Sequence, residues 1–199
     1  MTKNRLEAFS DGVFSIAITL LVLDIKLPKT EVASDKQLLS QLNLALPNII
    51  TFIFSFLVVG VFWVAHHRIF AFIKHVDHYL LWSNIFYLMT IAIIPFPASV
   101  LAKHPFFVSS IIFYSCILFL CGCQHFFFLR HICRNEHLRE SSFTNATYKR
   151  ALKTASIGPG CYLLAIIFSF VHPLISFCFI LAALVFYIFL AQLIIAKHA

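Results

Sequence analysis

Charged residues are scarce in this sequence. They make up 12% of the 199 residues, whereas they make up about a quarter of a typical soluble domain. Apolar residues account for 61%, and the mean hydropathy is +0.91. This balance predicts an integral, multi-pass membrane protein. Because a bilayer core about 30 Å thick needs about 20 apolar residues per helix, the chain has room for about six membrane helices and no soluble catalytic domain. We therefore do not expect an enzyme.

Other common features are also missing. Lys26, Leu27 and Pro28 follow the first apolar run where a signal peptide would have small residues and a cleavage site, so we expect this segment to stay attached. The six cysteines lie mostly in apolar runs, and residues 121–123 (CGC) lack the spacing of a zinc or redox motif. No second copy of the first segment follows. We expect one unit, residues 1–199, with no metal site and no cofactor.

The apolar segments predict six membrane-spanning helices. Their expected bounds are 6–25, 46–66, 79–101, 106–129, 152–171 and 173–195. With a cytoplasmic N-terminus, four basic residues fall outside: Lys26, Lys29, Lys36 and Lys103. The other 11 fall inside: Lys3, Arg5, Arg68, Lys74, Arg130, Arg134, Arg139, Lys149, Arg150, Lys153 and Lys197. Because basic residues favour the cytoplasmic side, both termini are expected there. Anionic lipid accounts for the net charge of +7, so we expect no nucleic-acid partner.

The first predicted helix combines an apolar stripe with an acidic residue. At 100° per residue, the six residues of this apolar stripe share one face: Phe9, Val13, Ile16, Leu20, Leu23 and Leu27. Thr19 lies beside the stripe, whereas Asp11 lies about 140° from Ile16. A carboxylate inside a membrane is costly unless it is paired. Asp11 should therefore face other helices and not lipid.

The second predicted helix offers partners for Asp11. It runs antiparallel to the first and ends with FWVAHHRIF, in which Trp63, His66 and His67 share one side at spacings of three and four residues. These side chains and Arg5 are potential hydrogen-bond donors to the carboxylate. We expect Asp11 to clamp the two helices together.

Two other roles remain open for these polar residues. Asp11, His66 and His67 could bind protons or a coupling ion in a secondary cation transporter. His66 or His67 could instead be an axial haem ligand, with His125 as the second ligand. The first role would make the protein a carrier, and the second would make it a cytochrome-like membrane enzyme.

The first helix also carries a recognisable motif. Arg5, Phe9, Ser10 and Asp11 form R-x-x-x-F-S-D, followed by GVFSIAITLLVLDIKLP and later by FWVAHHRIF. This arrangement resembles the short prokaryotic members of the transmembrane protein 175 family of potassium channels. The resemblance implies a homotetramer in a prokaryotic plasma membrane. It also implies that the first helix lines a central pore for monovalent cations that has no carbonyl filter.

The resemblance assigns roles to individual residues. It implies a pore constriction made by Ile16, Leu20 and Leu23, with the hydroxyl of Thr19 beside it. A narrow apolar ring can block ions by losing its water until it widens. We therefore predict a potassium-selective or potassium-preferring cation channel, K⁺ being its permeant ion. The alternative is the secondary cation transporter described above.

Overall fold

A computed structural model describes residues 2–27, 33–140 and 144–190 of the chain. The predicted all-α architecture is confirmed, because every regular element in these ranges is helical: α1 (Lys3–Leu20), η1 (Leu21–Asp24), α2 (Asp35–Ala71), α3 (His78–Ile93), α4 (Pro95–Lys103), α5 (Val108–Arg134), α6 (Asn145–Phe168), α7 (Pro173–Val185) and η2 (Phe186–Leu190). Pro28, Lys29, Lys197 and the expected helical residues 191–195 lie outside the described residues.

Six helical segments correspond to the six predicted spans. Five are long and apolar enough to cross a bilayer: Lys3–Asp24, Asp35–Ala71, His78–Lys103, Val108–Arg134 and Asn145–Phe168. The sixth, Pro173–Phe189, is apolar but shorter. Short 3₁₀ and π-helical turns, η1 and η2, extend the first and last of the six.

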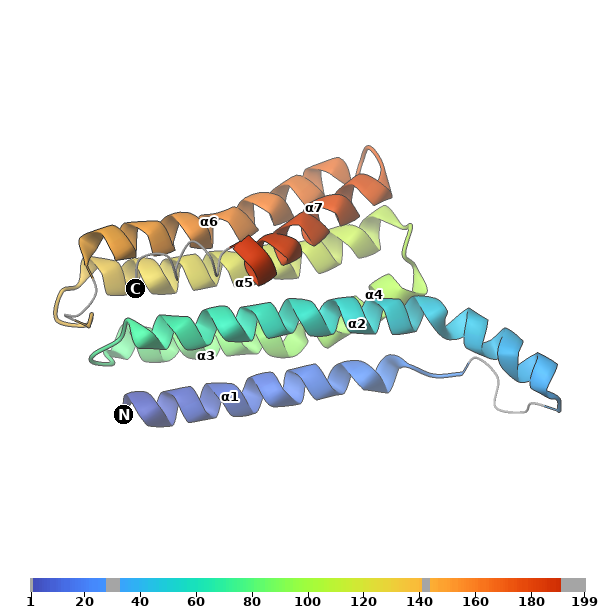
Figure 1. Cartoon of the computed structure of the whole chain (residues 1–199), viewed down its shortest axis with the longest axis horizontal. Helices are drawn as coiled ribbons and strands as arrows, with labels where there is room; N and C mark the ends of the chain where they lie inside the picture. Colours follow the sequence, from blue (N-terminus) through green and yellow to red (C-terminus); the bar gives the residue numbers. More distant parts are fainter. Residues whose placement is uncertain (1, 28–32, 141–143, 191–199) are drawn as a thin grey trace.

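The helices lie side by side along the long axis of the molecule (Figure 1). In this view α1 forms one edge, α2 and α3 lie in the middle, and α5, α6 and α7 form the opposite edge. The start of α1, the end of α2, the start of α3, the end of α5 and the start of α6 lie together at one end. We call it the N-terminal end; from the distribution of basic residues we expect it to face the cytoplasm.

α2 is longer than its apolar sequence predicts. It begins at Asp35, eleven residues before the expected start, and Ser34 caps it by accepting a hydrogen bond from the Gln37 N–H at 3.4 Å. Pro47, which cannot donate a backbone hydrogen bond, lies inside the helix. The first turns of α2 lean away from the bundle and extend beyond the end of α1 (Figure 1). The polar link expected at 26–45 is therefore partly an extension of α2.

Prolines shape two other helices differently. The third span breaks at Ile94, directly before Pro95. α6 instead continues through Pro159. There the Tyr187 hydroxyl accepts a hydrogen bond from the Gly158 N–H at 2.9 Å and donates one to the Thr154 carbonyl at 3.0 Å. A side chain at residue 158 would meet this hydroxyl, since an added Cβ would lie 2.9 Å from it. The tyrosine thus satisfies polar backbone groups next to the proline.

Two groups of buried apolar side chains hold the bundle together. The larger group joins α1, α2, α3, α5, α6 and α7, with Phe14, Tyr114 and Leu118 among its most buried members. The smaller group lies at the N-terminal end and includes Leu6, Phe70 and Ile132. α1 contributes to both groups, so its orientation is fixed along its whole length.

Candidate functional site

α1 has one buried face. Its buried residues are spaced three or four apart and pack against the rest of the chain: Leu6, Ser10, Phe14 and Ala17. Phe14 is 1% exposed, and its ring lies 5.5 Å from the His66 ring and 6.1 Å from the Tyr87 ring. This face fixes which side of α1 points away from the protein.

The apolar stripe lies on the face that points away. Ile16 is 61% exposed, Leu20 42% and Leu23 62%, and Phe9 is exposed as well. Val13 is half-buried at the edge of the stripe, and Leu27 follows the end of the helix at Asp24. The stripe is therefore not packed core within this chain. Within the described residues Ile16, Leu20 and Leu23 stay largely exposed, so lipid, water or another copy of the protein can contact them.

Thr19 lies on the exposed side of α1, as the sequence predicts. Its hydroxyl donates back to the helix, 2.9 Å from the Ile16 carbonyl and 3.0 Å from the Ser15 carbonyl. A hydroxyl has one donor and two acceptor lone pairs. Oriented in this way, Thr19 presents its oxygen lone pairs to whatever occupies the space beside the stripe.

Asp11 contacts the second helix through Trp63. The Trp63 indole N–H donates a hydrogen bond to Asp11 Oδ1 at 2.8 Å. Asp11 is half-buried, and Trp63 is 39% exposed. This hydrogen bond ties α1 to α2.

His66 takes part in a different contact from the expected one. His66 Nε2 lies 2.7 Å from the Asn84 Oδ1, and the Asn84 amide donates to the Ser10 hydroxyl at 3.0 Å. Ser10 in turn donates to the Leu6 carbonyl at 2.8 Å. All three side chains in this chain of hydrogen bonds are buried. We call Ser10, His66 and Asn84 the buried triad, which joins α1, α2 and α3.

The other two expected partners of Asp11 also lie elsewhere. His67 Nδ1 is 3.1 Å from the Glu7 carboxylate, and its ring stacks on Trp63. Arg5 is exposed and takes part in no ion pair within the described ranges. Asp11, His66 and His67 therefore contact three different partners and do not share one binding site.

Aromatic side chains fill the space around His66 that a haem group would need. Its ring stacks on Tyr87 with a centroid distance of 5.4 Å and an angle of 5°, and the rings of Phe14, Phe70 and Phe128 surround it. Among the described residues, no group of three or more His, Cys, Asp or Glu side chains could hold a metal ion.

Asn84 is the member of the buried triad that sequence reasoning missed. It lies in the span expected at 79–101, where the flanking residues are mostly apolar. An amide in such a helix needs partners within the bundle, because lipid supplies none. That rule alone marks Asn84 as a residue that faces other helices.

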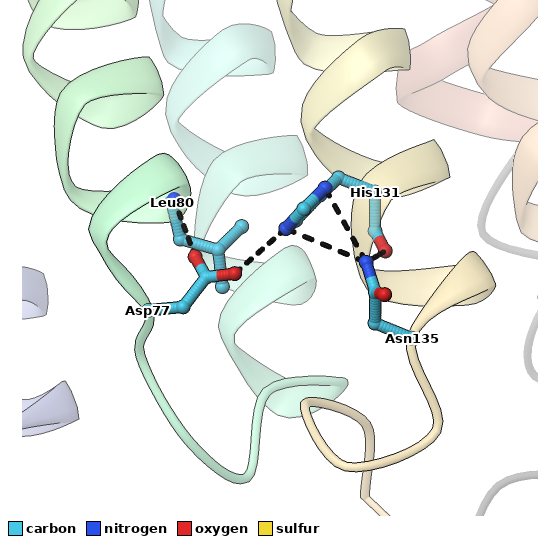
Figure 2. Close-up of polar contacts among 4 residues, drawn as sticks. All are labelled: Asp77, Leu80, His131 and Asn135. Carbon is cyan, nitrogen blue, oxygen red and sulfur yellow. Dashed lines mark hydrogen bonds and ion pairs between the residues drawn. The ribbon is translucent and has the colours of Figure 1, made fainter.

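A second polar cluster lies at the N-terminal end, between α3 and α5 (Figure 2). Asp77 caps α3 by accepting a hydrogen bond from the Leu80 N–H at 2.7 Å, and its other oxygen lies 2.8 Å from His131 Nε2. The Asn135 amide donates to the His131 carbonyl at 2.9 Å. Burial acts to raise the pKa of Asp77, but the hydrogen bonds from Leu80 and His131 prevail and hold this pKa below its usual value.

Asp24 ends the first segment at the opposite end of the bundle. Its carboxylate accepts a hydrogen bond from the Ser99 hydroxyl of α4 at 2.9 Å, and its carbonyl accepts one from the Asn48 amide at 3.4 Å. Asp24 is half-buried. These contacts hold the end of α1 and η1 against α2 and α4.

This arrangement has counterparts among known proteins. Residues 5–95 match the sequence model of a family described as endosomal/lysosomal potassium channel TMEM175. A protein from Chamaesiphon minutus named as a potassium channel is 36% identical over 183 residues, covering 89% of this chain and 90% of its own. The chain belongs to the TMEM175 family. This family consists of ion channels and not enzymes, as the sequence predicts.

Structures and more distant relatives agree with this assignment. The crystal structure of a lysosomal potassium-selective channel TMEM175 homolog from Chamaesiphon minutus superposes with a TM-score of 0.82 at 31% identity, covering 94% of this chain and 96% of its own. A TMEM175 protein from Gallus gallus, named as an endosomal/lysosomal proton channel, is 29% identical over 93% of this chain but only 38% of its own.

The comparisons also bear on location and on the buried triad. The chain is a multi-pass integral membrane protein, and its relatives of similar length are bacterial, which indicates a prokaryotic membrane. The family match at residues 5–95 includes α2, α3 and all of α1 except its first two residues. All members of the buried triad and the Asp11–Trp63 contact lie inside that range.

Proposed function

We propose that this TMEM175 protein is a potassium-preferring cation channel that assembles as a homotetramer around α1. The observation that carries the proposal is the division of α1 into a face fixed by the chain and an apolar stripe that the chain leaves exposed. One chain supplies one such stripe, so a central pore needs several copies around an axis. The names of the bacterial relatives support potassium as the permeant ion.

The constriction is assigned to Ile16, Leu20 and Leu23. In a closed ring of α1 helices their exposed side chains converge, and a narrow apolar neck loses water readily. Thr19 supplies a hydroxyl oxygen next to this neck, which can replace part of the hydration of a passing cation. The gate is thus set by the width and polarity of side chains on α1.

A secondary transporter is less well supported. A carrier needs its coupling-ion ligands to converge near the middle of the membrane. Here Asp11 contacts Trp63, His67 contacts Glu7, and His66 contacts Asn84. The separation of these partners favours a structural role for all three residues.

Substitutions at Ile16 test the pore assignment. Ile16→Asn should keep water in the neck, increase cation current and weaken the discrimination between potassium and sodium. Ile16→Phe should narrow the neck and reduce current. Single-channel current and reversal potential would be recorded in planar bilayers with potassium on one side and sodium on the other.

The matched control is Ile53 on α2, which is also exposed, at 52%. Ile53→Asn and Ile53→Phe should leave conductance and reversal potential unchanged when the protein assembles equally well. Parental conductance in both Ile16 variants would show that the stripe does not line the ion path. Strictly coupled flux in liposomes, with no current under a voltage alone, would identify a carrier.

Assembly is tested separately by mass measurement in a mild detergent. The proposal requires a tetramer, since four stripes enclose the path. A conducting monomer would rule out a shared central pore, whatever the behaviour of the Ile16 variants.

A further inference from the structure

A basic pocket lies between α5 and α6 at the N-terminal end. It has a volume of about 330 Å³ and is lined by Phe126, Arg130, Cys133, Arg134, Arg139, Asn145, Tyr148, Lys149 and Leu152. Four of these nine residues are cationic. The pocket is far along the sequence from the stripe and shares no residue with the buried triad.

Three of the four cations have no acidic partner among the described residues. Arg139 is held in place by the Asn145 side-chain oxygen at 2.7 Å, by Glu136 at 3.2 Å and by the face of the Tyr148 ring. Arg130, Arg134 and Lys149 form no ion pair within the described parts of the chain. The nearby acids Glu136 and Glu140 do not line the pocket.

The first turn of α6 adds to the positive potential. α6 begins at Asn145, which lines the pocket, and Thr144 caps the helix by accepting a hydrogen bond from the Thr147 N–H. No acidic residue lies in this first turn. The partial positive charge of a helix N-terminus favours an anion.

The opposite part of the pocket is apolar. Phe126 lies eight residues before Arg134 on α5, about 12 Å deeper along the helix. Leu152 lies at the corresponding depth on the antiparallel helix α6. The pocket therefore has a cationic mouth at the membrane surface and an apolar floor toward the membrane interior.

We propose that this pocket binds the headgroup of an anionic phospholipid. The phosphate oxygens would contact Arg130, Arg134 and Lys149, and the first carbons of the acyl chains would lie against Phe126 and Leu152. Basic pockets between membrane helices on the cytoplasmic side are suited to such headgroups. A soluble phosphate compound shares the anionic chemistry but has no use for the apolar floor.

Native mass spectrometry of the whole protein in mild detergent tests this proposal. Phosphatidylglycerol and phosphatidylcholine with identical acyl chains would be titrated, and bound lipids counted per chain. We expect one retained phosphatidylglycerol per chain and a clear preference over phosphatidylcholine. The double variant Arg134→Gln/Lys149→Gln should bind phosphatidylglycerol about 30-fold more weakly.

The matched control is Arg150→Gln/Lys153→Gln. These two exposed residues lie on the same part of α6, carry the same total charge and do not line the pocket. The control should lose less than about fivefold in affinity. An equal loss of affinity in both double variants would show that phosphatidylglycerol is attracted to the charged surface in general. It would overturn the proposal of a specific site in the pocket.

Two further measurements distinguish lipid binding from binding of a soluble anion and cover the case in which the double variant fails to assemble. Inorganic pyrophosphate is added to delipidated protein, and the melting temperature is compared with that in phosphatidylglycerol. Equal stabilisation by pyrophosphate would assign the pocket to a soluble anion and overturn the lipid proposal. If the double variant does not assemble, Arg134→Gln alone should still weaken phosphatidylglycerol binding about fivefold. An unchanged affinity in that variant would also overturn it.

Discussion

The two faces of α1 differ in how far the rest of the chain buries them. On one face Phe14 is 1% exposed, and Ser10 is fully buried within the buried triad. On the other face Ile16 and Leu23 are more than half exposed, although both are more hydrophobic than Ser10. Hydrophobicity therefore does not decide which face packs inside a membrane protein, because lipid is as apolar as leucine.

The difference shows how the helix divides its tasks. Shape and hydrogen bonds fix the buried face, since a polar group without a partner is costly away from water. On the apolar stripe, Ile16, Leu20 and Leu23 are not buried by the described parts of the chain. The proposed gate on α1 requires both properties, a firm attachment on one side and an adjustable surface on the other.

The largest effect expected is a contrast between neighbouring apolar positions. Phe14→Ala leaves a cavity among the rings of His66 and Tyr87, so we expect the free energy of unfolding to fall by about 3 kcal/mol. Ile16→Ala should change this free energy by less than about 1 kcal/mol and instead alter conductance. Unfolding in mixed micelles and bilayer recordings would measure the two quantities. Similar destabilisation by both variants would remove the distinction between the faces.

Breaking the buried triad should have the next largest effect. Asn84→Ala leaves His66 Nε2 and the Ser10 hydroxyl without their partner, and we expect a loss of about 2 kcal/mol in the free energy of unfolding. Asn48→Ala is the control, because its amide makes a single long hydrogen bond of 3.4 Å. Equal melting temperatures for the two variants would mean that the triad does not hold α1 in place.

The contact between Asp11 and Trp63 is expected to contribute less. Both residues are partly exposed, so a double-mutant cycle with Asp11→Ala and Trp63→Phe should give a coupling energy of about 1 kcal/mol. The cycle is measured by thermal unfolding at neutral pH. Additive effects of the two substitutions would show that the hydrogen bond does not stabilise α1. A current that loses its pH dependence in Asp11→Asn would instead assign a proton site to this residue.

Much of this organisation can be predicted from the sequence. The periodicity of residues 9–23 predicts the apolar stripe, and the R-x-x-x-F-S-D motif predicts the family. These predictions depend only on the sequence pattern within a single helix.

The predictions that were wrong, the partners of the two histidines and the start of the second helix, depended on contacts that a single apolar pattern does not show. The histidines at 66 and 67 differ by about 100° around α2, so they face different neighbours, but the sequence does not say which. His66 turns toward Asn84, and His67 turns toward Glu7. Asn84 lies on α3 and Glu7 on α1, so the choice depends on how these helices pack against α2. Likewise, the early start of α2 depends on the Ser34 cap, which hydropathy does not detect.

The smallest effect is expected at the cluster in Figure 2, which links α3 to α5. Asparagine is also a good helix cap, so Asp77→Asn keeps a side-chain acceptor for the Leu80 N–H but loses the charge that faces His131. We expect a loss of about 0.5 kcal/mol in the free energy of unfolding at neutral pH and no change in current.

The pH dependence identifies the charge as the cause. The pKa of Asp77 is lower in the folded protein than in the unfolded chain, so its ionised form stabilises the fold above the unfolded value, near 4. This contribution is lost as the pH falls through the lower, folded value. Thermal unfolding between pH 3 and 7 should therefore show a wild-type advantage over Asp77→Asn that disappears at the acid end. An advantage that grows toward low pH would contradict the lowered pKa. A change in current at neutral pH would show that this cluster also affects the pore.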